Sequence, residues 1–294
     1  SNGIEYVNAA IKSGLDPNSF GKKLSFFFNS HNHFFEEISK FRAARRMWSS
    51  IMKNRFGVTD KDAMKCRFHT QTAGSTLTAQ DIDNNIVRTS LQATAAVLGG
   101  TQSLHTNAKD EALALPTDDS ARLALRTQQI IAHESGIPDV IDPLAGSYFV
   151  ESLTDQIEKE ANLIITEIDA MGGAIKAIDS GFQQSRIAKS SYEYQMEIDK
   201  KDKIIVGVND MVSKNLQNPK IQKIDPALIQ KQINRIQKIK KIRDNKKVEI
   251  CLQKIGKSIN ASSNLVPVIV EAAESYCTLG EITEVLKFTY GEFK

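Results

Sequence analysis

Cysteine is scarce in this chain. The 294 residues contain three, Cys66, Cys251 and Cys277, and no two of them have the Cys-x-x-Cys spacing. This pattern excludes a disulfide-stapled secreted scaffold and favours a reducing compartment, so we expect the protein in the cytoplasm. The N-terminus shows no secretion signal, and no stretch approaches the ~18 consecutive apolar residues that span a bilayer. We therefore expect no membrane partner.

Several familiar active-site signatures are missing as well. The chain has no Gly-x-Ser-x-Gly elbow, which argues against an α/β-hydrolase, and neither of the two glycine-rich loops that cradle phosphates. Of the five histidines, only His31 and His33 are close enough in sequence to share a metal ion, and no cysteine or carboxylate stands at a supporting distance. Polar caps at a strand-to-helix turn explain this pair better, and we predict no metal site.

Charge is close to balanced, with a net charge of +3, and does not demand a nucleic-acid partner. The excess is concentrated between Lys231 and Lys247, where eight Lys or Arg face one acid, Asp244. Isoleucines at 229, 233, 236, 239 and 242 predict a helix whose apolar face packs on protein. We expect its basic face to be solvated. An acidic partner or nucleic acid is the alternative, although no aromatic residues are present there to stack on bases.

The first half of the chain alternates helical and strand-like patterns. Short apolar or mixed runs at 24–28, 65–71 and 102–106 predict strands, and the longer amphipathic segments between them predict helices at 34–53 and 84–98. This alternation implies parallel strands in an α/β fold. Three strands are too few to close a barrel, so the fold is either a small open sheet or part of a barrel. We expect one domain at 1–205 and a linker with further helices at 206–294.

Polar residues gather at the carboxyl ends of the predicted strands, where parallel α/β folds bind ligands. Asn29 to His33, Thr72 to Thr76 and His105 to Glu111 follow the three strands. Within the second strand, His69 and Gln71 are two residues apart and must share a face. A buried strand rarely carries two large polar side chains on one face, so a cavity-lining role is about as well supported as a hydrogen-bonded core histidine.

The strings themselves resemble a known family. LSFFFNSHN (24–32), FRAARRMW (41–48), RFHTQTAG (67–74), LTAQ (77–80), LGGTQSLHTN (98–107) and DPLAGSY (142–148) resemble the large (alpha) subunit of the methylmalonyl-CoA mutases. That family folds as a (β/α)8 TIM barrel around its acyl-CoA. The resemblance implies that this chain holds the last three strands and their helices, followed by a C-terminal helical region. The first five strands would lie upstream of it.

The resemblance also implies roles for individual residues. His69 and Gln71 match catalytic groups that line the cavity. Those that match the cofactor contacts are Gly74, Asn107, Glu111 and Ala114, with Asn107 and Glu111 at the adenosyl ribose. Those that match contacts to the CoA thioester are Lys23 and Ser25. The family usually has arginine at the position of Lys23. Lysine keeps the charge but loses the planar fork for bidentate anion binding.

The implied activity is an isomerase reaction. Members of the family use adenosylcobalamin and radical chemistry to interconvert (R)-methylmalonyl-CoA and succinyl-CoA. The cobalamin-binding signature Asp-x-His-x-x-Gly is absent, since the nearest string, residues 131–136, lacks the aspartate. With the rest of the barrel and the cobalamin-binding domain both missing from it, we expect the chain to be inactive alone. Its partners would be a cobalamin-binding domain or small subunit, the N-terminal part of the barrel, and further copies in a homo- or hetero-oligomer. An isobutyryl-CoA or 2-hydroxyisobutyryl-CoA mutase fragment and a non-catalytic half-barrel remain alternatives.

Overall fold

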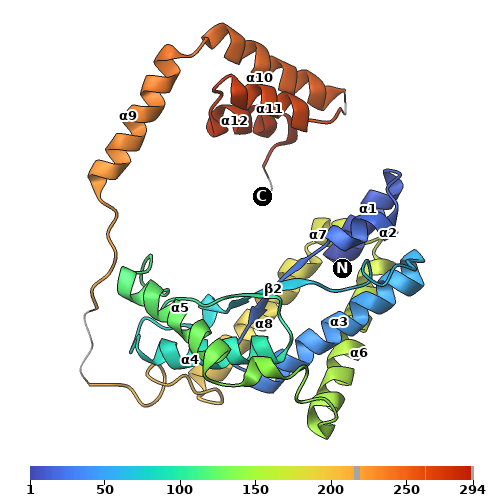
Figure 1. Cartoon of the computed structure of the whole chain (residues 1–294), viewed down its shortest axis with the longest axis vertical. Coiled ribbons are helices and arrows are strands. Elements are labelled where there is room, and N and C mark those ends of the chain that lie inside the picture. The colour runs from blue at the N-terminus through green and yellow to red at the C-terminus, as the bar shows by residue number, and fades with distance from the viewer. Residues whose placement is uncertain (215–218, 262, 293–294) are drawn as a thin grey trace. The chain divides into compact units, whose positions relative to one another are not determined.

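The computed structural model describes residues 1–214, 219–261 and 263–292, and Figure 1 shows its elements. The chain divides into two compact units, Ser1–Gln222 and Lys223–Lys294. The boundary that we predict after residue 205 stays a prediction. Residues 215–218 of the predicted linker lie outside the described residues.

A three-stranded parallel sheet forms the centre of the first unit, with the strands in sequence order. Its first cross-strand hydrogen bond runs from the Phe26 amide to the Arg67 carbonyl, which explains why the first strand begins two residues later than its apolar run. Phe27 pairs with His69, and His69 with Ser103. The strands are β1 (Phe26–Ser30), β2 (Phe68–Thr72) and β3 (Ser103–His105). The three predicted parallel strands are confirmed.

Two long helices cover one face of this sheet. Helix α3 (Phe34–Phe56) contributes Phe41 and Trp48 to a core that also contains Phe68 from β2. The rings of Phe41 and Phe68 stack at 5.2 Å between centroids, and Trp48 meets Phe26 edge-on at 4.7 Å. Helix α4 (Asn84–Leu98) packs beside α3 and over the strands. Helix α6 (Tyr148–Ala170) lies along the outer side of α3 (Figure 1).

The boundaries of these helices follow local chemistry. Gly57 ends α3 with a φ of 66°, a left-handed conformation that glycine adopts without steric cost. Thr117 caps α5 (Asp118–His133) by accepting a hydrogen bond from the Ser120 amide. Residues 203–208 form a link with one isolated bridge, Val206 to Asp210. The other helices of this unit are α1 (Asn2–Lys12), α2 (Pro17–Phe20), α5 (Asp118–His133), α7 (Ala174–Asp179) and α8 (Phe182–Asp199), with 3-10 turns at Gly21–Lys23, Gly74–Thr76 and Ile137–Asp139.

The second unit consists of helices and their connections, and its described residues include no strand. Asp225 caps its first helix by accepting from the Ala227 amide, as the Asp-Pro pair predicts. The core comes from the later helices and includes Cys251, Ile255 and Ile282. The helices are α9 (Pro226–Ile242), α10 (Asn245–Asn260), α11 (Val266–Glu274) and α12 (Leu279–Tyr290).

The predicted packing of the isoleucine stripe is not formed within this unit. Helix α9 buries none of its residues, and Ile233 is 41% exposed. The reason is that the core of the unit is complete without it. Three helices, α10, α11 and α12, pack on one another around Ile255 and Ala272.

The other face of the sheet carries no helix layer among the described residues. Phe27, on that face, is 61% exposed, whereas Phe68 on the helix-covered face is 2% exposed. A parallel sheet is normally covered on both faces. One covered and one open face is the arrangement expected of a barrel segment, whose inner face meets the remaining strands. The fold is thus a partial α/β barrel followed by helices, as predicted. No described helix is both long and apolar enough to cross a bilayer.

Candidate functional site

The open face of the sheet is built by the two-residue alternation of its strands. Residues 68, 70 and 72 of β2 are buried toward the helices, and His69 and Gln71 between them are partly exposed. The register places Asn29 beside Gln71, and Gln71 beside His105. The side chains of this open face are therefore those of Phe27, Asn29, His69, Gln71, Ser103 and His105.

His69 occupies the middle of this open face. Its Nδ1 lies 2.7 Å from the Ser103 hydroxyl on the neighbouring strand, and its ring tilts against Phe27 at 5.0 Å. Both contacts come from the open face and neither comes from the helix layer. The alternative that His69 is a core histidine is therefore not what the structure describes.

Gln71 connects the open face to the end of β3. Its Nε2 donates a hydrogen bond of 3.0 Å to Oδ1 of Asn107. The Asn107 amide nitrogens are also engaged, because its backbone N–H donates to the Thr72 hydroxyl and its Nδ2 to the Thr72 carbonyl, both at 2.9 Å. Asn107 is 2% exposed. Its side chain is thus fixed by β2, and one Nδ2 hydrogen and one Oδ1 lone pair remain for a ligand.

Gly74 lies directly against Asn107. A Cβ atom at this glycine would come within 2.8 Å of Asn107 Nδ2 and 3.4 Å of Glu111 Cγ, which is too close for any other residue without displacement. Three of the residues predicted to hold the cofactor, Gly74, Asn107 and Glu111, are therefore brought together at the carboxyl edge of the sheet. Ala114 follows in the same turn, where its N–H donates to the Asp110 carbonyl at 3.1 Å.

Glu111 is exposed, and its carboxylate has no hydrogen-bond or ion-pair partner in the part of the chain that the structure describes. Glu111 does not cap the helix that follows the third strand, because Thr117 is the N-cap of α5. The carboxylate is available as an acceptor for hydroxyl groups.

Lys23 and Ser25 lie at the opposite edge of the sheet. Lys23 ends the 3-10 turn Gly21–Lys23, and Ser25 immediately precedes β1. Both side chains are exposed. Because the strands are parallel, residues that precede β1 and residues that follow β2 and β3 must be separated by the length of the strands. The predicted substrate contacts and the predicted cofactor contacts thus stand at the two ends of one open face.

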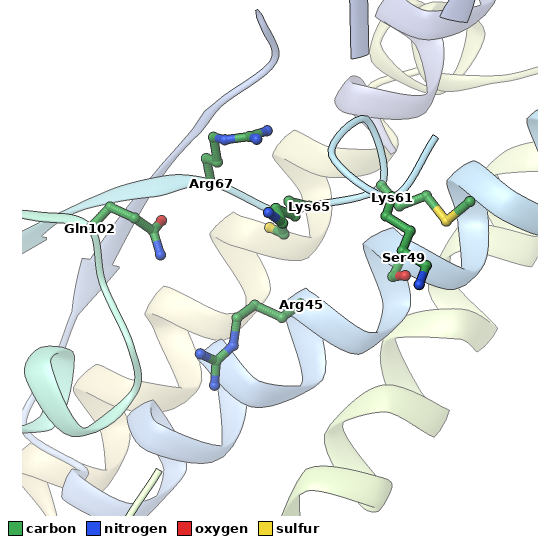
Figure 2. Close-up of a pocket in the computed structure, with 8 residues that line it drawn as sticks. Arg45, Ser49, Lys61, Lys65, Arg67 and Gln102 are labelled. Atoms are coloured by element: carbon green, nitrogen blue, oxygen red, sulfur yellow. The ribbon is translucent and has the colours of Figure 1, made fainter. Parts of the chain in front are cut away.

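A basic cavity of about 510 Å³ opens at the edge where β2 and β3 begin. Figure 2 shows Arg45 and Ser49 reaching it from α3, and Lys61, Lys65 and Arg67 from the segment that enters β2. Its described lining contains four cations and no acid. The complete lining is Arg45, Ser49, Lys61, Met64, Lys65, Cys66, Arg67 and Gln102.

Electrostatics mark this cavity as a place for an anion. Arg45 makes no hydrogen bond or ion pair with any described residue, and burial lowers its pKa from the ordinary value for arginine. An arginine that is half-buried and unpaired is costly unless an anion reaches it. Lys65 is paired with Asp62 at 2.5 Å. Burial also raises the pKa of the Cys66 thiol to about 12, so Cys66 stays protonated and is not a nucleophile.

Sequence reasoning missed this cavity. Arg45 and Ser49 are four residues apart and share a helix face, which was a visible signal. The cations at 61, 65 and 67 looked like an ordinary polar loop, and only the packing of that loop on α3 brings them to Arg45. Among the described residues, no group of three or more His, Cys, Asp or Glu is placed to hold a metal ion.

Comparison with known proteins finds similar sequences over the whole of this chain. A family model described as methylmalonyl-CoA mutase matches residues 1–292. The 2-hydroxyisobutanoyl-CoA mutase large subunit of Aquincola tertiaricarbonis is 46% identical over 297 residues, covering 100% of this chain and 53% of that protein. The methylmalonyl-CoA mutases of Rhizobium meliloti (strain 1021) and Escherichia coli (strain K12) are each 43% identical, covering 100% of this chain and 41% of those proteins. The chain spans about half the length of these relatives or less. It belongs to the methylmalonyl-CoA mutase family.

Proposed function

We propose that this chain is one part of an adenosylcobalamin-dependent acyl-CoA mutase that interconverts (R)-methylmalonyl-CoA and succinyl-CoA. The enzyme would be complete only with the remaining strands of the barrel and with a cobalamin-binding domain or subunit. Membership of the family supports this proposal, as does the share of the relatives that the chain spans. Assembly as a homo- or hetero-oligomer follows from the same reasoning.

The observation that carries the proposal is the open face between two chemically different edges. At one edge stand Lys23, Ser25 and the basic cavity, which suit a phosphorylated, anionic ligand. At the other stand Gly74 and the unpaired Glu111, which suit a neutral ligand with hydroxyl groups. A long acyl-CoA lying along the sheet would present its phosphates to the first edge and its acyl end toward the second.

The basic cavity is suited to the phosphates of coenzyme A. Arg45 can donate two parallel hydrogen bonds to a phosphate, a geometry that lysine cannot match. Arg67 would add the donors that its hydrogen bond to the Asp62 carbonyl leaves free. Lys23 would act as a point charge nearer the start of β1. Coenzyme A binding at this edge would leave the carboxyl edge free for the cofactor.

The carboxyl edge fits the adenosyl part of the cofactor on two observations. The missing Cβ of Gly74 leaves a close approach to Asn107, and the exposed Glu111 carboxylate offers two acceptor oxygens for ribose hydroxyls. When bound, adenosylcobalamin supplies the radical chemistry of the rearrangement. The contribution of this chain is to bind the hydroxyls through Glu111 and Asn107, and Gly74 and Ala114 would lie against the cobalamin.

His69 and Gln71 lie between the two edges and are proposed to line the reaction cavity. His69 is oriented by Ser103, and Gln71 by Asn107. Closing the barrel over them would exclude water, which strengthens their hydrogen bonds and protects reactive intermediates from side reactions. Their task is to orient the acyl group and contain it.

A second candidate substrate follows from one comparison. The relative with 46% identity is a 2-hydroxyisobutanoyl-CoA mutase large subunit, slightly nearer than the 43% of the methylmalonyl-CoA mutases. A 2-hydroxyisobutyryl-CoA mutase would use the same two edges and differ in groups outside this chain. The experiment that distinguishes these two substrates also tests isobutyryl-CoA as a substrate and a non-catalytic assembly role for the chain.

The experiment is isolation of the assembled protein. The tagged chain is purified from its own cells with whatever chains complete it, and the complex is assayed with the three acyl-CoA esters, with and without adenosylcobalamin. The proposal predicts cofactor-dependent conversion of (R)-methylmalonyl-CoA. Conversion of 2-hydroxyisobutyryl-CoA or isobutyryl-CoA instead would reassign the substrate. A stable complex that converts none of them would favour the non-catalytic role.

We propose the cytoplasm as its location, for the reason that the three cysteines suggest. All three are free thiols, and Cys66 and Cys251 are buried. A reducing compartment accommodates such thiols without pairing them. Immunolocalisation of the tagged chain in its own cells tests the assignment.

A further inference from the structure

Helix α4 carries two large polar side chains that are completely buried. Asn85 and Gln92 are each 0% exposed, and their spacing of seven positions places both on the face turned toward the sheet. A helix normally presents apolar residues to a sheet, and a buried amide is costly unless all of its hydrogen bonds are made. Both amides are fully engaged, and their partners are the loops at the carboxyl edge.

Gln92 joins the loops after β1 and β2. Its Oε1 accepts from the Ala73 N–H at 3.0 Å, and its Nε2 donates to Asn32 Oδ1 at 2.5 Å and to the Thr76 hydroxyl at 2.6 Å. Its backbone carbonyl also accepts from the Ser30 hydroxyl at 2.8 Å. One side chain therefore holds the two residues on either side of Gly74–Ser75 and connects them to the end of β1.

Asn85 joins the loops after β2 and β3. Its Nδ2 donates to the carbonyls of Thr78 at 2.8 Å and Lys109 at 2.9 Å. Its Oδ1 accepts from the Thr78 N–H at 3.1 Å and from Arg88 at 2.8 Å. Lys109 lies between Asn107 and Glu111, so Asn85 fixes the turn that carries both of those residues.

We propose that Gln92 and Asn85 are positioning residues, which set the approach of Gly74 to Asn107 and Glu111 and so shape the cofactor edge without touching the ligand. A Cβ atom at position 74 would lie 2.8 Å from Asn107 Nδ2, so the approach of this loop to Asn107 depends on the glycine. A shift of the loop away from Asn107 would open the edge. This inference rests on the proposed function for the identity of the ligand, but its structural half does not depend on that function.

Two isosteric variants and a matched control test the proposal. Gln92→Met keeps the length of the side chain and removes its three side-chain hydrogen bonds. Asn85→Asp keeps the acceptor that faces Arg88 and the Thr78 N–H, and removes the two hydrogen bonds donated to the Thr78 and Lys109 carbonyls. The control is Thr89→Val, on the same buried face at 2% exposed, since its hydroxyl has no partner among the described residues. The control should behave as wild type.

The measurements are hydrogen exchange of the full chain in its assembled complex, adenosylcobalamin affinity, and the separate kcat and KM for the acyl-CoA ester. We expect Gln92→Met to speed exchange at residues 73–78, and Asn85→Asp at 107–111, with exchange in α3 unchanged. Cofactor affinity and kcat should fall between about 10- and 100-fold, as for a catalytic geometry displaced by about an ångström, while KM for the ester stays within about twofold.

The outcomes separate the two proposals. Exchange and cofactor affinity equal to wild type in both variants would overturn the positioning role, and so would a uniform loss of stability with kcat unchanged in the folded fraction. A wild-type complex that binds no adenosylcobalamin would refute the proposed function. In that case faster exchange confined to the two loops still supports their fixation by Gln92 and Asn85, and unchanged exchange still refutes it.

Discussion

Gln71 and Asn107 are joined by a 3.0 Å hydrogen bond from Nε2 to Oδ1, and this bond connects the middle of the open sheet face to its carboxyl edge. His69 lies two residues before Gln71 on the same face, and Gly74 lies three residues after it, against Asn107. The reaction cavity and the cofactor edge that we propose are therefore parts of one hydrogen-bonded arrangement.

His69→Ala should leave the fold nearly intact. The ring lies on the partly exposed face, where it contacts the Ser103 hydroxyl and Phe27, so the free energy of unfolding should fall by about 1 kcal/mol or less. In the assembled enzyme, the loss of a cavity-lining group should speed inactivation per turnover. The control is Ser103→Ala, which removes the hydrogen bond to the His69 ring and leaves the ring itself in place. A loss of several kcal/mol with normal inactivation would instead mean a core role.

Glu111→Ala should separate turnover from substrate binding. Loss of a charge-assisted hydrogen bond to the ribose is worth ~10–150-fold in turnover. KM for the acyl-CoA should change little, because Lys23 and Ser25 lie at the opposite edge. Steady-state kinetics of the assembled enzyme provide both values, and Glu160→Ala on α6 is a matched exposed acid. Equal turnover in the two variants would remove Glu111 from the site.

Phe27 should make the isolated chain self-associate. It is 61% exposed on a face with free strand edges, and such faces pair with other molecules in water. Size-exclusion chromatography with light scattering should show oligomers that bind a hydrophobic dye, and Phe27→Ser should reduce both. A compact monomer that binds no dye would contradict a sheet that lacks its other half.

Acid should destabilise the first unit through Glu151. A hydrogen bond from Arg42, together with one from the Gly146 N–H, lowers the pKa of Glu151 to about 2. Because the charged form is favoured by folding, its stabilisation is present above the ordinary pKa near 4.5 and is lost as pH falls toward about 2. Trp48, the one tryptophan of the chain, reports this unit by fluorescence.

In Glu151→Gln, the urea midpoint measured by this fluorescence should depend less on pH between about pH 4.5 and pH 2 than in the wild type, because the neutral amide does not titrate. Glu281→Gln is the matched control in the second unit, where Arg243 holds the pKa of Glu281 well below its usual range. Glu281→Gln should leave the urea midpoint measured by Trp48 fluorescence, and its dependence on pH, unchanged. If the urea midpoint of Glu151→Gln kept the pH dependence of the wild type, that dependence would come from other carboxylates.

Much of the fold could be predicted from the sequence. The aromatic run before Asn29 and the mixed pattern of Phe68 to Gln71 identify strands, because a sheet with one covered face imposes a two-residue period. Helix α4 was predicted at its observed bounds, since Gly99 and Gly100 mark its end. The packing of α9 could not be predicted in this way, because an amphipathic stripe shows that a helix face is apolar and does not show what covers it.

The division at Asp244 was also missed. The basic stretch reads as one segment, but Arg243 ends α9, and Asp244 caps α10 by accepting from two amides. The caps were visible in the Asp-Asn pair. Gln92 and Asn85 were not identifiable, because a glutamine or asparagine within a helix has the same sequence signal whether it faces solvent or the loops of a site. Only the packing of α4 on the sheet reveals that Gln92 and Asn85 face the loops of the site.

The central claim is that the open sheet face is the inner surface of a barrel that another part of the enzyme completes around the acyl-CoA. The most direct test is the structure of the assembled complex with an acyl-CoA bound. We predict that the ester lies along this face, with its phosphates near Arg45 and Arg67 and its acyl end beside His69 and Gln71. A helix packed over His69 and Gln71, or an ester bound elsewhere, would contradict the account.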